Sequence, residues 1–243
     1  MTGLMIRMKC ITNLHAGNGD VNYNIVDNEV ERDPILQYPT VNASGVKGAL
    51  REYFEKAKPD LVKPLFGSDE KRNTTPGKLK ILAAEMIGIP VRVSKGDRPY
   101  ALVTTQEALN RLQELCALPG VSVSVSPNPT DGVELEGLQP DQKLTLNFGG
   151  QLELYRIGDE AMKQLSLPVL SRNSLDDGRS TNLWYEEVVP HESVFSFAVL
   201  ADDSDRDSLT AFADTVRDQV VQFGGNASIG YGLCRLTVME GTR

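Results

Sequence analysis

The order of its periodic segments constrains the fold of this 243-residue chain more than any other feature. Apolar residues recur at helical spacing from about Ser44 to Lys58, and again from Asp207 or Ser208 onward. Strand-like segments stand before, between and after these two helices. In the order strand, helix, strands, helix, strand, both helices can pack on a single antiparallel sheet. We therefore predict an α+β fold with helices on one face of an antiparallel sheet.

Both helices have an apolar face. Asn42 or Ser44 can cap the start of the first helix, and Pro59 lies just beyond its end. The apolar residues are Val46, Ala49, Leu50, Tyr53, Phe54 and Ala57 in the first helix, and Leu209, Phe212, Ala213, Val216, Val220 and Phe223 in the second.

The strand-like segments are bounded by turn residues. Gly149 and Gly150 separate two of them and indicate a hairpin. We expect Thr104 with Glu107 to form a capping box for a further helix that reaches Leu118. We expect strands at residues 4–13, 80–86, 99–103, 143–148, 151–157, 194–201 and 233–239.

This frame fits a split βαβ core, of the ferredoxin-like (RRM-like) type, within one domain of residues 1–243. Residues 59–78, 104–140 and 172–190 are expected to be insertions on that core. In the last insertion, a polar and turn-rich tip at residues 176–179 separates two strand-like arms, 172–175 and 183–189. This pattern predicts a protruding β-hairpin.

The cysteine, histidine and apolar content excludes several classes of protein. Cys10, Cys116 and Cys234 lie far apart without a CxxC pair, so neither a disulfide framework nor a zinc site is expected. Two histidines are too few for a histidine-rich metal centre. No apolar run approaches the ~20 residues that a membrane span needs. These observations favour a cytoplasmic protein without a membrane segment.

The net charge of −8 conceals one basic stretch. Residues 41–80 contain nine basic and five acidic residues, whereas the rest of the chain is acidic. Phosphate binding depends on the local field and not on net charge, so this stretch permits RNA binding without proving it. The basic residues are Lys47, Arg51, Lys56, Lys58, Lys63, Lys71, Arg72, Lys78 and Lys80.

Two segments could hold a phosphate. Lys47 and Arg51 lie one turn apart near the start of the first helix, where Ser44 and two glycines keep the helix slim. A helix N-terminus also attracts anions, although a solvated charged face is the alternative. The closing turn, residues 224–232, contains four glycines. They could expose N–H groups to an anion, or could only serve a tight connection from helix to strand.

Several motifs occur together in a characteristic order. They are His15-x-Gly17-x-Gly19, Val26-Asp27-x₄-Arg32-Asp33, Ser44-Gly45-Val46-Lys47-Gly48-Ala49-Leu50-Arg51 and Gly224-Gly225-Asn226-x₃-Gly230-x-Gly232. In order and spacing they resemble the CRISPR repeat-associated RAMP proteins. Arg172-Asn173 followed by Leu183–Pro190 resembles the Cas7-like backbone subunit of the type III-B, or Cmr-type, effector complex more than its III-A counterpart. The resemblance covers both ends and the hairpin, whereas residues from about 60 to 165 have no match.

The resemblance implies a RAMP-type core whose copies stack as a helical filament along guide RNA, with other subunits of the effector complex. Its hairpin, or thumb, would be residues 172–190 and would displace a base pair of the guide–target duplex. The thumb residues that match are Trp184, Tyr185, Glu186 and Glu187. The matching RNA-binding positions are Ser44, Lys47, Arg51, Arg172, Gly224, Gly225, Asn226, Gly230 and Gly232.

Asp27 by itself would be no more than a loop cap, but it matches the aspartate with which the family cleaves target RNA. Aspartate is in general a weak general base at neutral pH. We therefore expect Asp27 to help hold a divalent cation, Mg²⁺, with RNA oxygens completing the coordination shell. His15 could assist in acid–base chemistry, or it could only fix its own glycine loop.

Other functions stay open from the sequence. The chain could be a structural guide-RNA-binding subunit without cleavage activity, or a III-A-type backbone subunit. It could also be a stand-alone guide-processing endonuclease, although such enzymes generally lack the Leu-Trp-Tyr-Glu-Glu segment. A small-molecule enzyme fits least, because the sequence contains no cofactor fingerprint.

Overall fold

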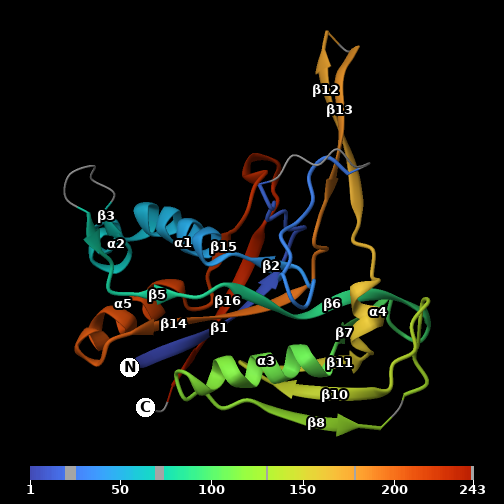
Figure 1. Ribbon diagram of the computed structural model, residues 1–243, viewed down its shortest axis with the longest axis horizontal. Coiled ribbons are helices and arrows are strands. Elements are labelled where there is room, and N and C mark those ends of the chain that lie inside the picture. The colour runs from blue at the N-terminus through green and yellow to red at the C-terminus, as the bar shows by residue number, and fades with distance from the viewer. Residues whose placement is uncertain (20–25, 69–73, 130, 178, 242–243) are drawn as a thin grey trace.

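One large sheet, mostly antiparallel, organises the computed structural model, which describes residues 1–19, 26–68, 74–129, 131–177 and 179–241. Its main strands are β1 (Thr2–Cys10), β6 (Ala84–Lys95), β7 (Tyr100–Thr104), β8 (Ser124–Asn128), β10 (Gln142–Asn147), β11 (Gln151–Arg156), β14 (Val194–Ala201), β15 (Val220–Gln222) and β16 (Leu233–Glu240). Short strands β2 (Thr40–Val41), β5 (Lys80–Ile81) and β9 (Glu134–Leu135) pair with it. The main strands lie in the order β15-β16-β1-β14-β6-β7-β11-β10-β8 (Figure 1).

Strand β1 lies between β14 and β16, so segments from both ends of the chain are neighbours. Ile6 faces Phe197 of β14 on one side and Val238 of β16 on the other. Every residue of β14 is buried. A strand that is covered on both faces needs a continuously apolar sequence, and β14 has one apart from Ser196.

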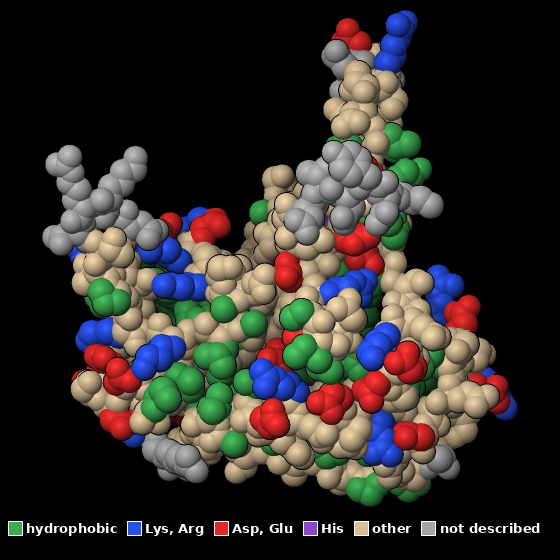
Figure 2. All heavy atoms as spheres, in the orientation of Figure 1, with side chains coloured by type: hydrophobic (Ala, Val, Ile, Leu, Met, Phe, Trp, Pro, Cys, Tyr) green, Lys and Arg blue, Asp and Glu red, His purple; other side chains and the backbone are tan. Residues whose placement is uncertain are grey.

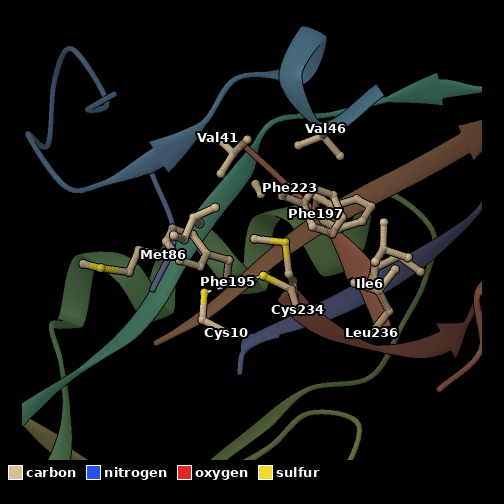
Figure 3. Packing of buried hydrophobic residues seen from close by; sticks show 14 of the residues in the cluster. Ile6, Cys10, Val41, Val46, Met86, Phe195, Phe197, Phe223, Cys234 and Leu236 are labelled. Atoms are coloured by element: carbon tan, nitrogen blue, oxygen red, sulfur yellow. Dashed lines mark hydrogen bonds between the residues drawn. The ribbon is translucent and has the colours of Figure 1, made fainter. Parts of the chain in front are cut away.

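Helices cover both faces of the sheet, which corrects the expectation of helices on one face only. On one face lie α1 (Ala43–Ala57), α2 (Pro59–Phe66) and α5 (Arg206–Val216), and the rings of Phe54 and Phe212 stack there with centroids 5.5 Å apart. On the other face, α3 (Gln106–Ala117) packs Leu109 against a cluster that contains Met5 of β1 and Ala198 of β14. Figure 3 shows part of the first cluster, with Val46 of α1 beside the aromatic rings.

The predicted first helix is confirmed within two residues, and a second helix follows it at once. Asn42 occupies the N-cap position of α1, although its side chain makes no capping hydrogen bond. Residues 59–66, which we expected to be loop, form α2. Pro59 stands in its first turn, where no N–H is needed, and buried Leu65 and Phe66 fix the helix on the core. Beyond it, β3 (Gly67–Ser68) pairs with β4 (Thr75–Pro76).

Two predicted helix boundaries were wrong. The N-cap of α3 is Thr105, whose hydroxyl accepts the N–H of Ala108, while the Thr104 hydroxyl donates to a strand carbonyl. α5 ends at Val216 instead of continuing to Phe223, because Asp218 adopts a left-handed backbone (φ 56°) and β15 begins. No described helix is long and apolar enough to cross a membrane.

The middle of the chain extends the sheet beyond β6. The expected hairpin is confirmed: β10 and β11 pair around residues 148–150, where Gly149 has a left-handed φ of 60°.

Lys143 bridges Asp131 and Glu153 at 2.8 and 3.0 Å. Burial of the Asp131 carboxyl opposes its ionisation, but hydrogen bonds from Lys143 and Tyr155 lower its pKa to about 2. A short helix, α4 (Asp159–Lys163), then leads toward the projecting hairpin.

Strands β12 (Val169–Asp176) and β13 (Arg179–Glu187) form a two-stranded antiparallel hairpin that projects from the sheet (Figure 1). Arg172 pairs with Trp184, and Asn173 pairs with Leu183. Both strands begin earlier along the chain than we expected. Gly178, which we assigned to the tip from the sequence, lies outside the described residues.

The buried centre of β1 generates a prediction about stability. Ile6 has no exposed surface, whereas 81% of Ile35 is exposed. Ile6→Ala should lower the free energy of unfolding by about 2–5 kcal/mol, because it leaves a cavity between two strands and the helices. Ile35→Ala, the matched control, should change it by less than ~0.5 kcal/mol. Urea unfolding measures both, and equal effects would contradict the assigned position of β1.

Candidate nucleic-acid interface

Residues 26–30, in the long connection after β1, lie along one edge of the projecting hairpin. Residues 26–30 run beside β13, with Asn28 and Glu186 forming a parallel bridge. The N–H of Asp27 donates to the carbonyl of Tyr185 over 3.1 Å, and the N–H of Glu187 donates to the carbonyl of Asn28 over 2.9 Å. The segment therefore acts as a third strand at the hairpin root, which we define as residues 169–172 and 184–187.

Asp27 is exposed and held by one carboxylate oxygen. Its Oδ2 accepts the N–H of Tyr185 over 2.8 Å. Its Oδ1 makes no hydrogen bond with any residue that the structure describes. One carboxylate oxygen of this exposed residue thus has no described hydrogen-bond partner and can accept a hydroxyl proton, contact a cation or bind an RNA hydroxyl.

His15 is buried between the hairpin root and the closing turn. Its Nδ1 donates to the carbonyl of Glu187 over 2.8 Å, since a carbonyl only accepts. Its own carbonyl accepts the N–H of Gly225 over 2.8 Å. The structure therefore brings His15 and Asp27 to the same strand, at Glu187 and Tyr185, while His15 already makes structural contacts on two sides.

The closing glycine turn needs glycine for steric reasons at two positions. A Cβ on Gly224 would lie 2.3 Å from the carbonyl oxygen of His15, and a Cβ on Gly232 would lie 1.8 Å from that of Phe223. Both residues also have left-handed backbones. The N–H groups of Gly225, Gly230 and Gly232 donate to protein carbonyls. The tight connection thus accounts for much of this motif, and those three amides are not free for an anion.

The start of α1 presents an open edge. Ser44 and Gly48 are exposed, and a Cβ added to Gly48 would meet nothing within 4 Å. Lys47 makes no hydrogen bond or ion pair with a described residue, so its ammonium group is available to a ligand. Arg51 is partly engaged, because its Nη1 donates to the carbonyl of Gly67 over 3.1 Å and its Nε contacts Glu55.

α1 and the glycine turn line a common groove of about 220 Å³, with Ala49 and Tyr53 on one side and Gly224 and Ala227 on the other. In Figure 2 a hollow separates the α1 region from the hairpin, with Lys and Arg side chains over α1 and acidic side chains near the hairpin root. Lys71 and Arg72, which we counted in the basic stretch, lie outside the described residues.

The side chains of the hairpin root have defined positions. Trp184 is half-buried, and its Nε1 donates to Glu186 over 3.0 Å. The guanidinium of Arg172 lies over the ring of Tyr231, 5.8 Å from its centroid. Tyr185 and Leu183 are exposed on the hairpin. Sequence reasoning missed Tyr231 and Arg32, although Arg32 stands in the same motif as Asp27.

The side chains at the site fit a metal ion whose ligands come mainly from a bound substrate. Within the described ranges, no group of three or more His, Cys, Asp or Glu side chains could hold a metal ion. Mg²⁺ commonly binds through one or two carboxylates, with waters and substrate phosphates as its remaining ligands. The free Oδ1 of Asp27 is compatible with that arrangement and supplies one ligand at most.

The glycine turn generates a prediction about backbone strain. Gly230 and Gly232 both have φ above 70°, but a Cβ on Gly230 would meet nothing within 4 Å. Gly230→Ala should lower the free energy of unfolding by ~1–2 kcal/mol through backbone strain alone. Gly232→Ala should cost clearly more, because its Cβ would also collide with a carbonyl. Thermal unfolding of both variants measures the difference, and equal costs would contradict this turn geometry.

Comparisons with known proteins agree with this architecture. The family model of the RAMP superfamily matches residues 7–235. The CRISPR system Cmr endoribonuclease Cmr4 of Pyrococcus furiosus is 25% identical over 290 aligned positions, which cover 100% of this chain and 97% of that protein. The CRISPR system CMR subunit Cmr4 of Saccharolobus solfataricus is 26% identical and covers 94% of each chain.

Solved structures show the same fold. A chain of the type III-B Cmr-beta complex bound to cognate target RNA superimposes with a TM-score of 0.77 at 22% identity, covering 98% of this chain and 97% of that one. Oligomeric Cmr4 from Pyrococcus furiosus has a TM-score of 0.71 at 20% identity, with 100% of both chains covered. Because the family model matches nearly the whole chain, this protein belongs to the RAMP superfamily.

Proposed function

We propose that this chain is the repeating backbone subunit of a type III-B CRISPR ribonucleoprotein, which binds guide RNA and cuts the paired target RNA at regular intervals. The observation that carries the proposal is the exposed Asp27 carboxylate, hydrogen bonded to the root of a projecting hairpin beside the glycine turn. Two relatives named as Cmr4, one of them as an endoribonuclease, support it. Its partners are guide RNA, target RNA, further copies of itself and the other subunits of the effector, in the cytoplasm.

The core has the connections of a ferredoxin-like domain. Neighbours in the order β16-β1-β14-β6 are all antiparallel. α1 lies in the connection from β1 to β6 across β14, and α5 lies in the connection from β14 to β16 across β1. On this basis residues 59–78, 104–140 and 172–190 are insertions within a single domain of residues 1–243.

Guide RNA lies over the start of α1 and the glycine turn. Lys47 supplies an unpaired cation, and Gly48 lets the RNA backbone approach the helix closely. Arg51 adds charge, but its contacts with Gly67 and Glu55 restrict it to a secondary role. These contacts recognise phosphates and shape, and base pairing between guide and target reads the sequence.

The hairpin β12–β13 acts as the thumb. Its exposed Leu183 and Tyr185 give it an apolar surface that can enter a duplex at the level of Asp27. Displacing one base pair frees the neighbouring target linkage from A-form geometry. The 2′-hydroxyl of that linkage can then align behind the phosphorus, and such orientation supplies a large part of the rate enhancement.

Asp27 acts where the hairpin has distorted the target. Its Oδ1 binds an RNA hydroxyl at the cleavage site or would supply one ligand to Mg²⁺. The cation would neutralise charge on the phosphate. The hydrogen bond from Tyr185 to Oδ2 keeps the carboxylate from turning away. His15 keeps the loop and the turn together through its bonds with Glu187 and Gly225.

A structural RNA-binding subunit without cleavage is the second candidate. It is favoured by the finding that, among the described residues, Asp27 belongs to no group of three or more His, Cys, Asp or Glu side chains that could hold a metal ion. The two functions differ in one observable. A complex of wild-type protein that binds complementary RNA firmly and leaves it intact would favour the scaffold.

Asp27→Asn tests the catalytic assignment. The amide oxygen still accepts the N–H of Tyr185, so the fold and the binding of both RNAs should be unchanged. Loss of the charge should slow the cutting of complementary RNA by ~100-fold or more. The measurement is the cleavage rate of end-labelled target with Mg²⁺ in the assembled complex. Periodic cutting at the wild-type rate would remove Asp27 from the mechanism.

Lys47→Ala tests the guide-binding surface. It should weaken binding of guide RNA and lower the slope of log affinity against log salt by about one, because one phosphate contact is lost. Lys163→Ala is the matched control, since Lys163 lies in α4 and pairs with Glu160. A salt series of binding measurements compares the two. Identical slopes for Lys47→Ala and wild type would reject a phosphate contact at Lys47.

A further inference from the structure

The strand β13 ends with two buried glutamates, Glu186 and Glu187, of which only 5% and 9% are exposed. Successive side chains of a strand point to opposite faces, so the two carboxylates point away from each other. Buried carboxylates are stable only when they are paired or hydrogen bonded. Each of these two must therefore find its partners on a different side of the hairpin root.

Glu187 binds the segment that carries Asp27. Its Oε1 lies 2.6 Å from Nη2 of Arg32, and its Oε2 accepts the N–H of Val30 over 3.1 Å. Its backbone N–H adds the bond to Asn28 described above. Three successive attachments thus fix residues 28–32 on the strand, and Asp27 is the residue just before them.

Glu186 binds the glycine turn instead. Its Oε2 accepts from Nδ2 of Asn226 over 3.0 Å and lies 3.7 Å from Nη1 of Arg172. Its Oε1 accepts the Trp184 indole N–H. Arg172 in turn covers the ring of Tyr231 at the other end of the turn. Asn226 has a left-handed backbone (φ 61°), which is uncommon for a residue other than glycine. Its hydrogen bond with Glu186 therefore fixes the turn at that residue.

We propose that the two glutamates divide the hairpin root between two tasks: Glu187 positions Asp27 for cleavage, and Glu186 positions the glycine turn for guide RNA. The assignment to cleavage and guide binding rests on the function proposed above. The division itself rests on the alternation of a β-strand and on separate sets of hydrogen bonds. The thumb is therefore connected to Asp27 and to the glycine turn by adjacent glutamate side chains that have separate sets of partners.

Both glutamates are positioning residues and not catalytic ones. Each of their four carboxylate oxygens already accepts a hydrogen bond or an ion pair from the protein. Binding of a metal ion or a proton would break these contacts and leave Arg32 or Arg172 without its partner. Their effect on RNA must pass through Asp27 and through the glycine turn.

Glutamine is the appropriate substitution at both positions, because it keeps the shape and removes the charge. In Glu187→Gln one oxygen can still accept from Val30, but the new NH₂ group meets the donors of Arg32. In Glu186→Gln the new NH₂ group meets the donors of Trp184 or Asn226. Each variant should loosen one contact set and serve as the matched control for the other.

Hydrogen–deuterium exchange on the isolated protein tests the division without RNA. Glu187→Gln should speed exchange in residues 26–33 and leave residues 224–232 at the wild-type rate. Glu186→Gln should do the reverse. Two variants that loosen the same segment, or neither segment, would overturn the inference.

Kinetics in the assembled complex then test the two tasks. Glu187→Gln should slow target cleavage by ~100-fold, the cost of a displacement of about 1 Å, with guide affinity unchanged. Glu186→Gln should weaken guide binding by about tenfold and leave the cleavage rate of bound target unchanged. Equal losses of both properties in both variants would contradict separate roles.

A double variant tests whether Glu187 acts through Arg32. Arg32→Gln combined with Glu187→Gln should cleave no more slowly than Glu187→Gln alone, because both changes break one contact. If the double variant cleaved more slowly than Glu187→Gln, by the product of the two separate effects, Glu187 would not act through Arg32. If the exchange data separate the two segments but wild-type complex leaves target intact, the division stands and the cleavage function falls.

Discussion

The structure depends on the antiparallel pairing that places β1 between β14 and β16. Beyond Cys10, β1 leads into the loop with His15 and Asp27; the glycine turn precedes β16, and the hairpin root precedes β14. Three segments from distant parts of the sequence therefore meet at one end of the sheet. Hydrogen bonds of His15 with Glu187 and Gly225 join all three. The candidate site is a consequence of strand order.

The candidate site has two physically distinct parts, which the proposed function assigns to guide binding and to cleavage. α1 and the glycine turn line a groove, and the first turns of α1 also carry Lys47, which has no described partner and can contact a phosphate. Asp27 lies beside β13 at the hairpin root; it is exposed, and its Oδ2 is held by the N–H of Tyr185. The net charge of −8 does not decide phosphate binding, because that depends on the local field. Lys78 and Lys80 of the basic stretch pair with Asp205 and Asp202, whereas Lys47 has no described partner.

Local patterns predicted much of the fold, and distant pairings explain what they missed. Helical spacing located α1, and continuous apolar character located β14. The same spacing wrongly extended α5 through Phe223, because periodicity does not register the left-handed Asp218. Pro59 and Pro64 made residues 59–66 look like a loop in the sequence. The helix α2 forms there because its buried residues contact the core. At the site, motifs predicted roles for Asp27 and Lys47, which stay predictions. The pair of Arg32 and Glu187 joins residues 155 positions apart, and no local pattern encodes it.

The central claim is that Asp27 faces the target linkage that the hairpin distorts. The most direct measurement is a density map of this protein assembled on guide RNA with a target that carries a 2′-deoxy substitution at the cut site. We expect the Asp27 carboxylate to lie beside the uncut phosphate, at the nucleotide displaced by β12–β13, with Lys47 on the guide strand. A map in which the target passes on the far side of the hairpin, away from Asp27, would contradict it.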